Sequence, residues 1–201
     1  MLDRLAVRLL RKPVTAAAVV LARMGIGANS ISLLGFALGL GAAACIASAR
    51  YAPGTVLILL SRSCDALDGA VARQTRASDA GGFLDIALDF LFYASIPLAF
   101  ALAQPVSNAL PAAVLLTAFM GTSSSFLAFA ALAAKRGMDN TDYPDKSIYF
   151  LGGLTEATET LGVFLAMCLW PQHFAVLAYG FAALCAITTA TRIVWGWRAF
   201  Q

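Results

Sequence analysis

Long apolar stretches, each of about 20 residues, occupy most of this chain and constrain its fold more than any other feature. A helix needs about 20 such residues to cross the roughly 30 Å hydrocarbon core of a membrane. The composition agrees, because 60% of the residues are hydrophobic and 12% are charged, about half the charge of an ordinary soluble domain. We therefore expect an all-α integral membrane protein that forms one domain over residues 1–201.

Six membrane spans are predicted, and proline or glycine marks several of the gaps between them. The expected ranges are 29–49, 54–73, 81–103, 109–134, 147–170 and 174–195. Together they form a bundle over about 29–195. Residues 1–24 differ, because basic residues alternate with leucines there. This pattern predicts an amphipathic helix in contact with membrane lipid at the interface, the alternative being a short disordered basic tail.

The basic residues are distributed asymmetrically between the two sides of the predicted bundle. If the N-terminus is cytoplasmic, Arg50 lies on the opposite side of the membrane and Arg62 lies within a span. The other 12 of the 14 Lys and Arg residues, Arg192 among them, then lie on the cytoplasmic side. The positive-inside rule then places both termini in the cytoplasm of a multi-pass, bacterial-type inner-membrane protein. The net charge of +3 is thus a topology signal, and no nucleic-acid partner is expected.

Acidic residues inside membrane spans are costly and usually functional. Six lie in the predicted spans, namely Asp65, Asp68, Asp85, Asp89, Glu156 and Glu159. Helical periodicity places Asp65 and Asp68 on one face of the second span, and Asp85 and Asp89 on one face of the third. The short connection brings these faces together near the cytoplasmic surface. Four carboxylates there need cations, and Mg²⁺ or Mn²⁺ prefers such oxygen ligands.

Small residues share the faces that carry the aspartates. Gly69, Ala72 and Gly81 leave room for a flat group, such as a nucleotide base, to approach the backbone. Arg73 and Arg76 follow at the helix end, where guanidinium groups can contact phosphates. The pattern therefore favours a nucleotide-linked ligand beside the metal.

Residues 65–89 contain a complete spaced motif. Asp65-x2-Asp68-Gly69-x2-Ala72-Arg73 is followed, after seven residues, by Gly81-x3-Asp85-x3-Asp89. This motif resembles the signature of the CDP-alcohol phosphatidyltransferase family, and Gly25–Ser32 resembles the segment that leads the family into its first span. The resemblance implies an enzyme of phospholipid biosynthesis. It would transfer a phosphatidyl group from a CDP-linked lipid donor, CDP-diacylglycerol, to an alcohol and release CMP.

The resemblance also implies a role for each motif position. The metal ligands are Asp65, Asp68, Asp85 and Asp89, holding two Mg²⁺ or Mn²⁺ ions per site, and Asp89 is also the general base. The nucleotide-binding residues are Asp68, Gly69, Ala72, Arg73 and Gly81. Family members are commonly homodimers in which each protomer holds its own site, here facing the cytoplasm.

Three further residues are candidates for binding the acceptor: Arg62, Glu156 and Glu159. Arg62 is either a counter-ion for the aspartates or a contact for an acceptor phosphate. The two glutamates either meet the acceptor or hydrogen-bond to neighbouring spans. Because carboxylates accept hydrogen bonds from hydroxyls and repel phosphate, a polyol or glycerol-type acceptor is favoured over a purely anionic one. Phe90 stands where relatives that use glycerol phosphate commonly carry lysine.

Other classes of protein also place acids in membranes. A structural polar network, an ion or metal transporter and an inactive scaffold are the alternatives. Gly69, Ala72 and Arg73 favour the enzyme, because a transporter has no need for a gap that fits a nucleotide.

Overall fold

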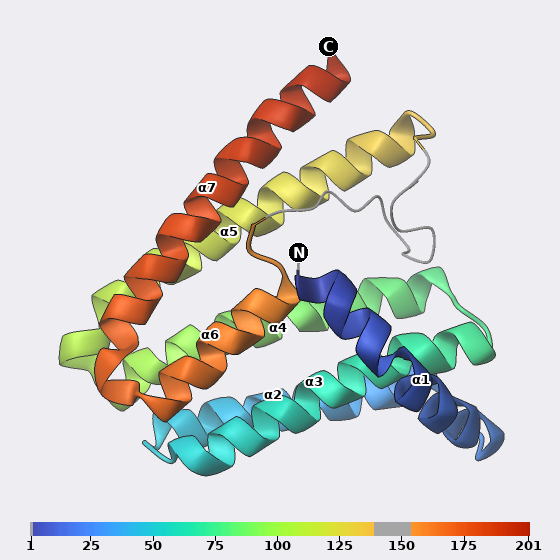
Figure 1. The fold of residues 1–201 in the computed structure, drawn as a ribbon, viewed down its shortest axis with the longest axis horizontal. Helices are drawn as coiled ribbons and strands as arrows, with labels where there is room; N and C mark the ends of the chain where they lie inside the picture. Colours follow the sequence, from blue (N-terminus) through green and yellow to red (C-terminus); the bar gives the residue numbers. More distant parts are fainter. Residues whose placement is uncertain (1, 139–153) are drawn as a thin grey trace.

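The structure is a computed structural model that describes residues 2–138 and 154–201. As predicted, these residues form helices and no strands. Figure 1 shows α1 (Leu2–Arg23), α2 (Ala28–Ala47), α3 (Tyr51–Gln74), α4 (Asp79–Ala103), α5 (Pro105–Lys135), α6 (Ala157–Leu169) and α7 (Phe174–Phe200), with a 3-10 turn at Pro171–His173. The helix expected near the N-terminus is present as α1, and its place on the membrane surface stays a prediction.

Five of the predicted spans agree with helices to within five residues at either end, but the fifth begins late. It was expected from residue 147, whereas α6 starts at Ala157, and residues 147–153 lie outside the described residues. The reason is local. Glu156 has an extended backbone (φ −113°, ψ −176°) and caps α6, and its N–H donates to Glu159 Oε2 at 3.2 Å. This capping box supplies partners for amides that a helix start leaves unpaired.

The helices differ in their ability to cross a membrane alone. Within the described ranges, α2, α4, α5 and the segment Pro171–Phe200 are long and apolar enough. The 24 residues of α3 suffice in length, but its second half carries the charged site residues. The 13 residues of α6 give a helix of about 20 Å, shorter than a hydrocarbon core of about 30 Å. The predicted number of six spans therefore stays a prediction.

Helix α2 packs directly against both α3 and α4. Gly35 and Gly39 make this close approach possible. A Cβ atom on Gly35 would lie 2.9 Å from Cys64 Cβ of α3, and one on Gly39 would lie 2.6 Å from the Phe92 ring of α4. Small residues allow such approach between membrane helices. The contact holds in place the two helices that carry the aspartates.

Helices α5 and α7 form the other part of the bundle. They run side by side toward the C-terminus and diverge from α2 and α3 (Figure 1). A buried aromatic core joins the two parts, with the Phe100 ring of α4 stacked on the Phe174 ring of α7 at a centroid distance of 4.6 Å. The two parts therefore meet at this end of the bundle and diverge toward the other (Figure 1).

Candidate active site

The C-terminal half of α3 and the N-terminal half of α4 form the hairpin expected from the sequence. Its α4 side begins with a cap, in which Ser78 Oγ accepts a hydrogen bond from the Gly81 N–H at 3.1 Å. Asp68 lies six residues before the end of α3, and Asp85 lies six residues after the start of α4. With a rise of about 1.5 Å per residue, both carboxylates lie at nearly the same depth.

Three aspartates form the candidate metal site. Carboxylate oxygens of Asp65, Asp68 and Asp85 all lie within 4.8 Å of one another. Oxygen ligands about 2.1 Å from Mg²⁺ are separated by at most about 4.2 Å, so small side-chain rotations would bring these oxygens onto one ion. The donor set consists of oxygens alone, which suits a hard divalent cation. These residues therefore fit the expected Mg²⁺ or Mn²⁺.

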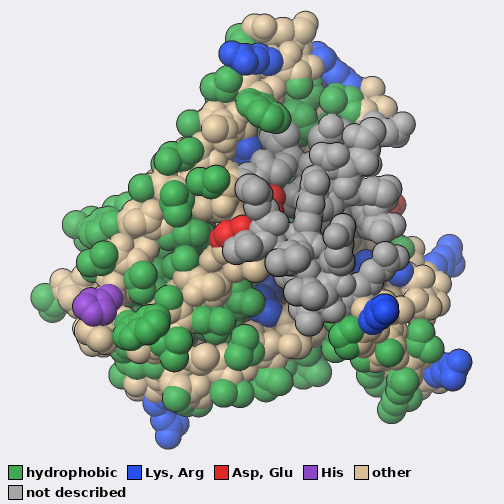
Figure 2. Space-filling view, viewed as in Figure 1, with side chains coloured by type: hydrophobic (Ala, Val, Ile, Leu, Met, Phe, Trp, Pro, Cys, Tyr) green, Lys and Arg blue, Asp and Glu red, His purple; other side chains and the backbone are tan. Residues whose placement is uncertain are grey.

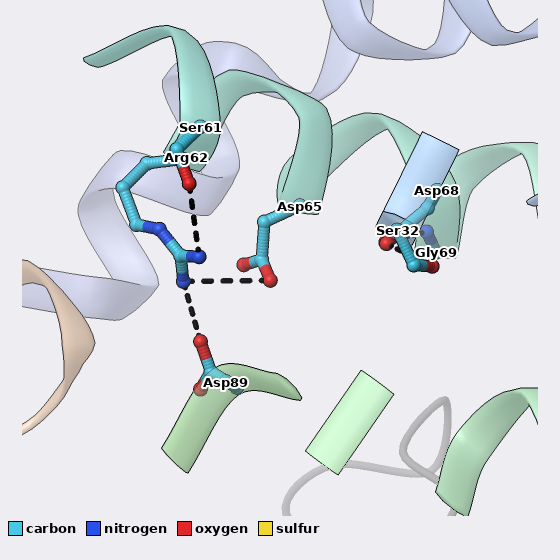
Figure 3. Close-up of polar contacts among 7 residues, drawn as sticks. All are labelled: Ser32, Ser61, Arg62, Asp65, Asp68, Gly69 and Asp89. Atoms are coloured by element: carbon cyan, nitrogen blue, oxygen red, sulfur yellow. Dashed lines mark hydrogen bonds and ion pairs between the residues drawn. The ribbon is translucent and has the colours of Figure 1, made fainter. Parts of the chain in front are cut away.

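Asp68 is buried and held on both oxygens. Ser32 Oγ of α2 donates to Asp68 Oδ2 at 2.6 Å, and the Gly69 N–H donates to Asp68 Oδ1 at 2.6 Å (Figure 3). Sequence reasoning assigned Ser32 no role. A signal was present, because Ser32 lies in the segment that resembles the family's lead into its first span. Such supporting hydrogen bonds orient a metal ligand.

Asp89 lies in a different environment from the other three aspartates. It forms an ion pair with Arg62, whose Nη1 also lies 3.5 Å from Asp65 Oδ1 (Figure 3). All four aspartates still line one small pocket, together with Ser32 and Arg62. The roles of Asp89 as metal ligand and general base stay predictions.

A larger cavity of about 970 Å³ shares the aspartates with this small pocket. All the predicted nucleotide-binding residues line it: Asp68, Gly69, Ala72, Arg73 and Gly81. A Cβ atom on Gly81 would lie 3.0 Å from Asn29 Oδ1, so glycine avoids a tight contact with Asn29 in this part of the cavity wall. The cavity has room for a nucleotide and an acceptor beside the aspartates.

The predicted acceptor residues separate in the structure. Glu156 lines the large cavity, whereas Glu159 is outside its described lining and accepts the Glu156 N–H as part of the helix cap. Both were expected inside the fifth span, but Glu156 precedes α6 and caps it. Arg62 lines only the smaller of the two described pockets. Acceptor binding by these three residues stays a prediction.

Arg192 of α7 is a further residue of the cavity wall, and sequence reasoning gave it no role in the site. Its side chain is buried, with 8% exposed, although it was counted among the cytoplasmic basic residues. Its Nη1 donates to the Thr122 carbonyl oxygen at 3.0 Å, and its guanidinium lies 5.5 Å from the Phe126 ring centroid. The available signal was an arginine near the end of an apolar span, since such residues are usually functional.

The face drawn in Figure 2 agrees with a membrane protein. Figure 2 shows hydrophobic side chains over much of one face, with the visible acidic side chains near its middle and several Lys and Arg side chains at projecting ends.

A helical membrane bundle with an oxygen-rich metal site beside a nucleotide-sized cavity defines a membrane-embedded, metal-dependent enzyme. Residues 25–194 match the sequence model of CDP-alcohol phosphatidyltransferase, and the chain belongs to this family. It is therefore an enzyme that transfers a substituted phosphate group in phospholipid synthesis, with a divalent metal as cofactor. Family membership favours the enzyme over the transporter.

Two curated proteins are similar in sequence. The chain is 54% identical over 174 residues to inner membrane protein YnjF of Escherichia coli (strain K12), covering 87% of this chain and 84% of that protein. It is 43% identical over 70 residues to archaetidylinositol phosphate synthase of Methanothermobacter thermautotrophicus, covering 34% and 36%. The long apolar helices are those of a membrane protein, in agreement with the first similarity.

Solved structures share the fold. Mycobacterium tuberculosis phosphatidylinositol phosphate synthase (PgsA1) with CDP-DAG bound has a TM-score of 0.68 at 20% identity, covering 92% of this chain and 93% of that chain. The same enzyme in complex with manganese and citrate has a TM-score of 0.71 at 20% identity, covering 92% and 88%.

Proposed function

We propose that the chain transfers the phosphatidyl group of CDP-diacylglycerol to a hydroxyl of a small polyol or glycerol-type alcohol that itself carries a phosphate, and releases CMP. The observation that carries this proposal is the single cavity that joins the aspartates and the candidate nucleotide residues to Glu156 and Arg192. Donor and acceptor can therefore meet at the metal site.

The donor is inferred from the motif side of the cavity. Gly69 and Gly81 leave space for the base, and Arg73 is available to the pyrophosphate. CDP-DAG is bound in the solved synthase of the same fold. Its acyl chains would lie along the apolar helix surfaces while its head reaches the aspartates.

The acceptor is inferred from the opposite wall. Glu156 can accept hydrogen bonds from hydroxyls, which suits a polyol. Arg192 supplies a buried positive charge, and guanidinium groups bind phosphate through paired hydrogen bonds. The names of two similar proteins, an archaetidylinositol phosphate synthase and a phosphatidylinositol phosphate synthase, fit an acceptor of this kind.

The reaction needs charge neutralisation, orientation and a base. A divalent ion held by Asp65, Asp68 and Asp85 would neutralise the pyrophosphate and stabilise the departing CMP. The hydrogen bond from Ser32 would help to orient Asp68 toward that ion. Asp89, which lines both pockets, would accept the proton of the attacking hydroxyl. The new bond joins the acceptor oxygen to the phosphatidyl phosphorus, and the bond from that phosphorus to CMP breaks.

The test is an acceptor panel. Purified protein is incubated with CDP-diacylglycerol and Mn²⁺ or Mg²⁺, together with inositol phosphate, glycerol 3-phosphate or the unphosphorylated inositol, glycerol or serine. We expect CMP and a lipid of matching mass only with a phosphorylated polyol. Turnover only with an unphosphorylated alcohol would overturn the acceptor class, and no CMP with any acceptor would overturn the function.

The two glutamates are expected to respond differently to amide substitution. Glu156→Gln should raise the acceptor KM by roughly three- to tenfold, a loss of about 1 kcal/mol typical of one hydrogen bond, with the donor KM unchanged. Both variants weaken the capping box, in which each glutamate side chain accepts a backbone N–H of the other residue, so both should lower the melting temperature, whereas Glu159→Gln should leave the acceptor KM unchanged. Steady-state kinetics and thermal unfolding in detergent separate the two effects. Equal kinetics for both variants and the wild type would remove Glu156 from the acceptor site.

We further propose that both termini and the active site face the cytoplasm. The basis is the distribution of basic residues together with the cytoplasmic supply of CDP-linked donors. Reporter fusions after Lys146 and at the C-terminus should read cytoplasmic, and fusions near Tyr51 and Gln172 should read periplasmic. A periplasmic result at Lys146 would place the aspartates on the wrong side.

We also propose a homodimer, as the family resemblance implies, with a complete set of aspartates in each protomer. Native mass spectrometry in mild detergent would detect it, and a monomer at every detergent and lipid condition that retains activity would contradict it.

A further inference from the structure

Arg62 is fixed more firmly than a surface counter-ion would be. Its side chain is 12% exposed, and its guanidinium carbon lies 3.9 Å from the centroid of the Phe92 ring. A second ring, Tyr93, lies 5.6 Å away, and Nη2 donates to Ser61 Oγ at 3.4 Å. Stacking on aromatic faces and ion pairing together hold an arginine in one orientation.

This fixed charge lies at one end of the aspartate cluster. Nη1 pairs with Asp89 and lies 3.5 Å from Asp65, whereas Asp68 lies on the other side of Asp65 (Figure 3). Carboxylate oxygens of Asp68 and Asp85 are grouped with one of Asp65. Asp65 therefore stands between two sites for positive charge. One is the candidate metal site that it forms with Asp68 and Asp85, and the other is occupied by the Arg62 guanidinium.

The charges favour a competition between arginine and metal. Four carboxylates can carry up to four negative charges, of which Arg62 neutralises one. A divalent ion at the position of Nη1 would be repelled by the buried guanidinium at close range. Such an ion could bind Asp65 and Asp89 only if Arg62 moved off its aromatic support.

We propose that Arg62 is a built-in cation that takes the place of a second divalent ion between Asp65 and Asp89, so that without donor the chain binds a single divalent ion. Asp89 is then held as a carboxylate by its ion pair with Arg62 and is not a resident metal ligand. This refines the expectation of two ions per site and rests on the metal site proposed above.

The test counts ions and needs no turnover, so its failure is distinct from failure of the proposed function. Purified protein is titrated with Mn²⁺ without nucleotide, and free Mn²⁺ is measured by electron paramagnetic resonance. We expect one ion per chain for the wild type, two for Arg62→Gln, and one for Arg62→Gln combined with Asp89→Asn. The control Arg50→Gln, an exposed arginine at the start of α3, should bind one. Two ions in the wild type, or one in Arg62→Gln, would overturn the proposal.

A second measurement keeps the proposal testable if Arg62→Gln does not fold. In the otherwise unchanged chain, Asp89→Asn should leave the Mn²⁺ affinity within about threefold, whereas Asp68→Asn should lower it by at least about tenfold. Equal losses of affinity in the two variants would show that Asp89 is a resident ligand and would overturn the role given to Arg62.

Discussion

Replacing any one of Asp65, Asp68, Asp85 or Asp89 with asparagine is expected to lower kcat by at least about 10²-fold while leaving a folded membrane protein. The first three carboxylates lie close enough to share one ion, and an amide supplies a weaker, uncharged ligand. Asp89→Asn removes the proposed base. The measurement is CMP release from CDP-diacylglycerol with saturating acceptor and metal.

The matched control is Asp79→Asn, which changes an exposed acid in the first turn of the same helix as Asp85. Its activity should stay within about twofold of the wild type, since it loses only a helix-dipole interaction of about 0.3–1 kcal/mol. Size-exclusion profiles and helical circular dichroism establish that each variant is folded. Near-normal turnover in any two of the four site variants would contradict the site.

Arg192→Gln is expected to raise the acceptor KM by roughly 10- to 100-fold with little change in the donor KM. Hydrogen bonds to charged groups contribute about 1.5–3 kcal/mol each, and every 1.4 kcal/mol is about tenfold in affinity. The effect should be largest for a phosphorylated acceptor, because the glutamine keeps a donor but loses the charge. Initial rates with each substrate varied in turn provide the measurement.

A purely structural role for Arg192 predicts a different result. Its hydrogen bond to the Thr122 carbonyl joins α7 to α5, so loss of that bond alone would lower thermal stability and leave both KM values unchanged. Arg198→Gln, an exposed arginine in the last turn of α7, is the matched control and should change neither. A rise in the donor KM alone would place Arg192 on the nucleotide side of the cavity.

The aspartate site could be predicted from sequence because its geometry is almost entirely local. Asp65 and Asp68 are separated by one helical turn, as are Asp85 and Asp89, and the short connection between α3 and α4 leaves few ways for the two faces to meet. The apolar runs likewise placed five helices, because length and hydrophobicity are properties of a segment by itself.

The predicted start of the fifth span was wrong because the spacing of its two glutamates fits more than one local structure. Glu156 and Glu159 have the spacing of one helix face, and that spacing also serves a capping box. Periodicity does not distinguish these outcomes. The start of α6 at Ala157 put both glutamates in the capping box, and of the two only Glu156 also lines the large cavity.

The sequence by itself determined a helical membrane protein, its aspartate hairpin and its chemical family, since these follow from segment composition and from spacing within about 25 residues. Only the tertiary structure decided that Ser32 supports Asp68, that Arg62 pairs with Asp89, and that Arg192 faces the same cavity. Ser32 and Asp68 are 36 positions apart, and Arg192 lies on the last helix. Which side chains meet over such separations depends on how the helices cross and how closely they approach, and glycine contacts such as those of Gly35 and Gly39 set that approach.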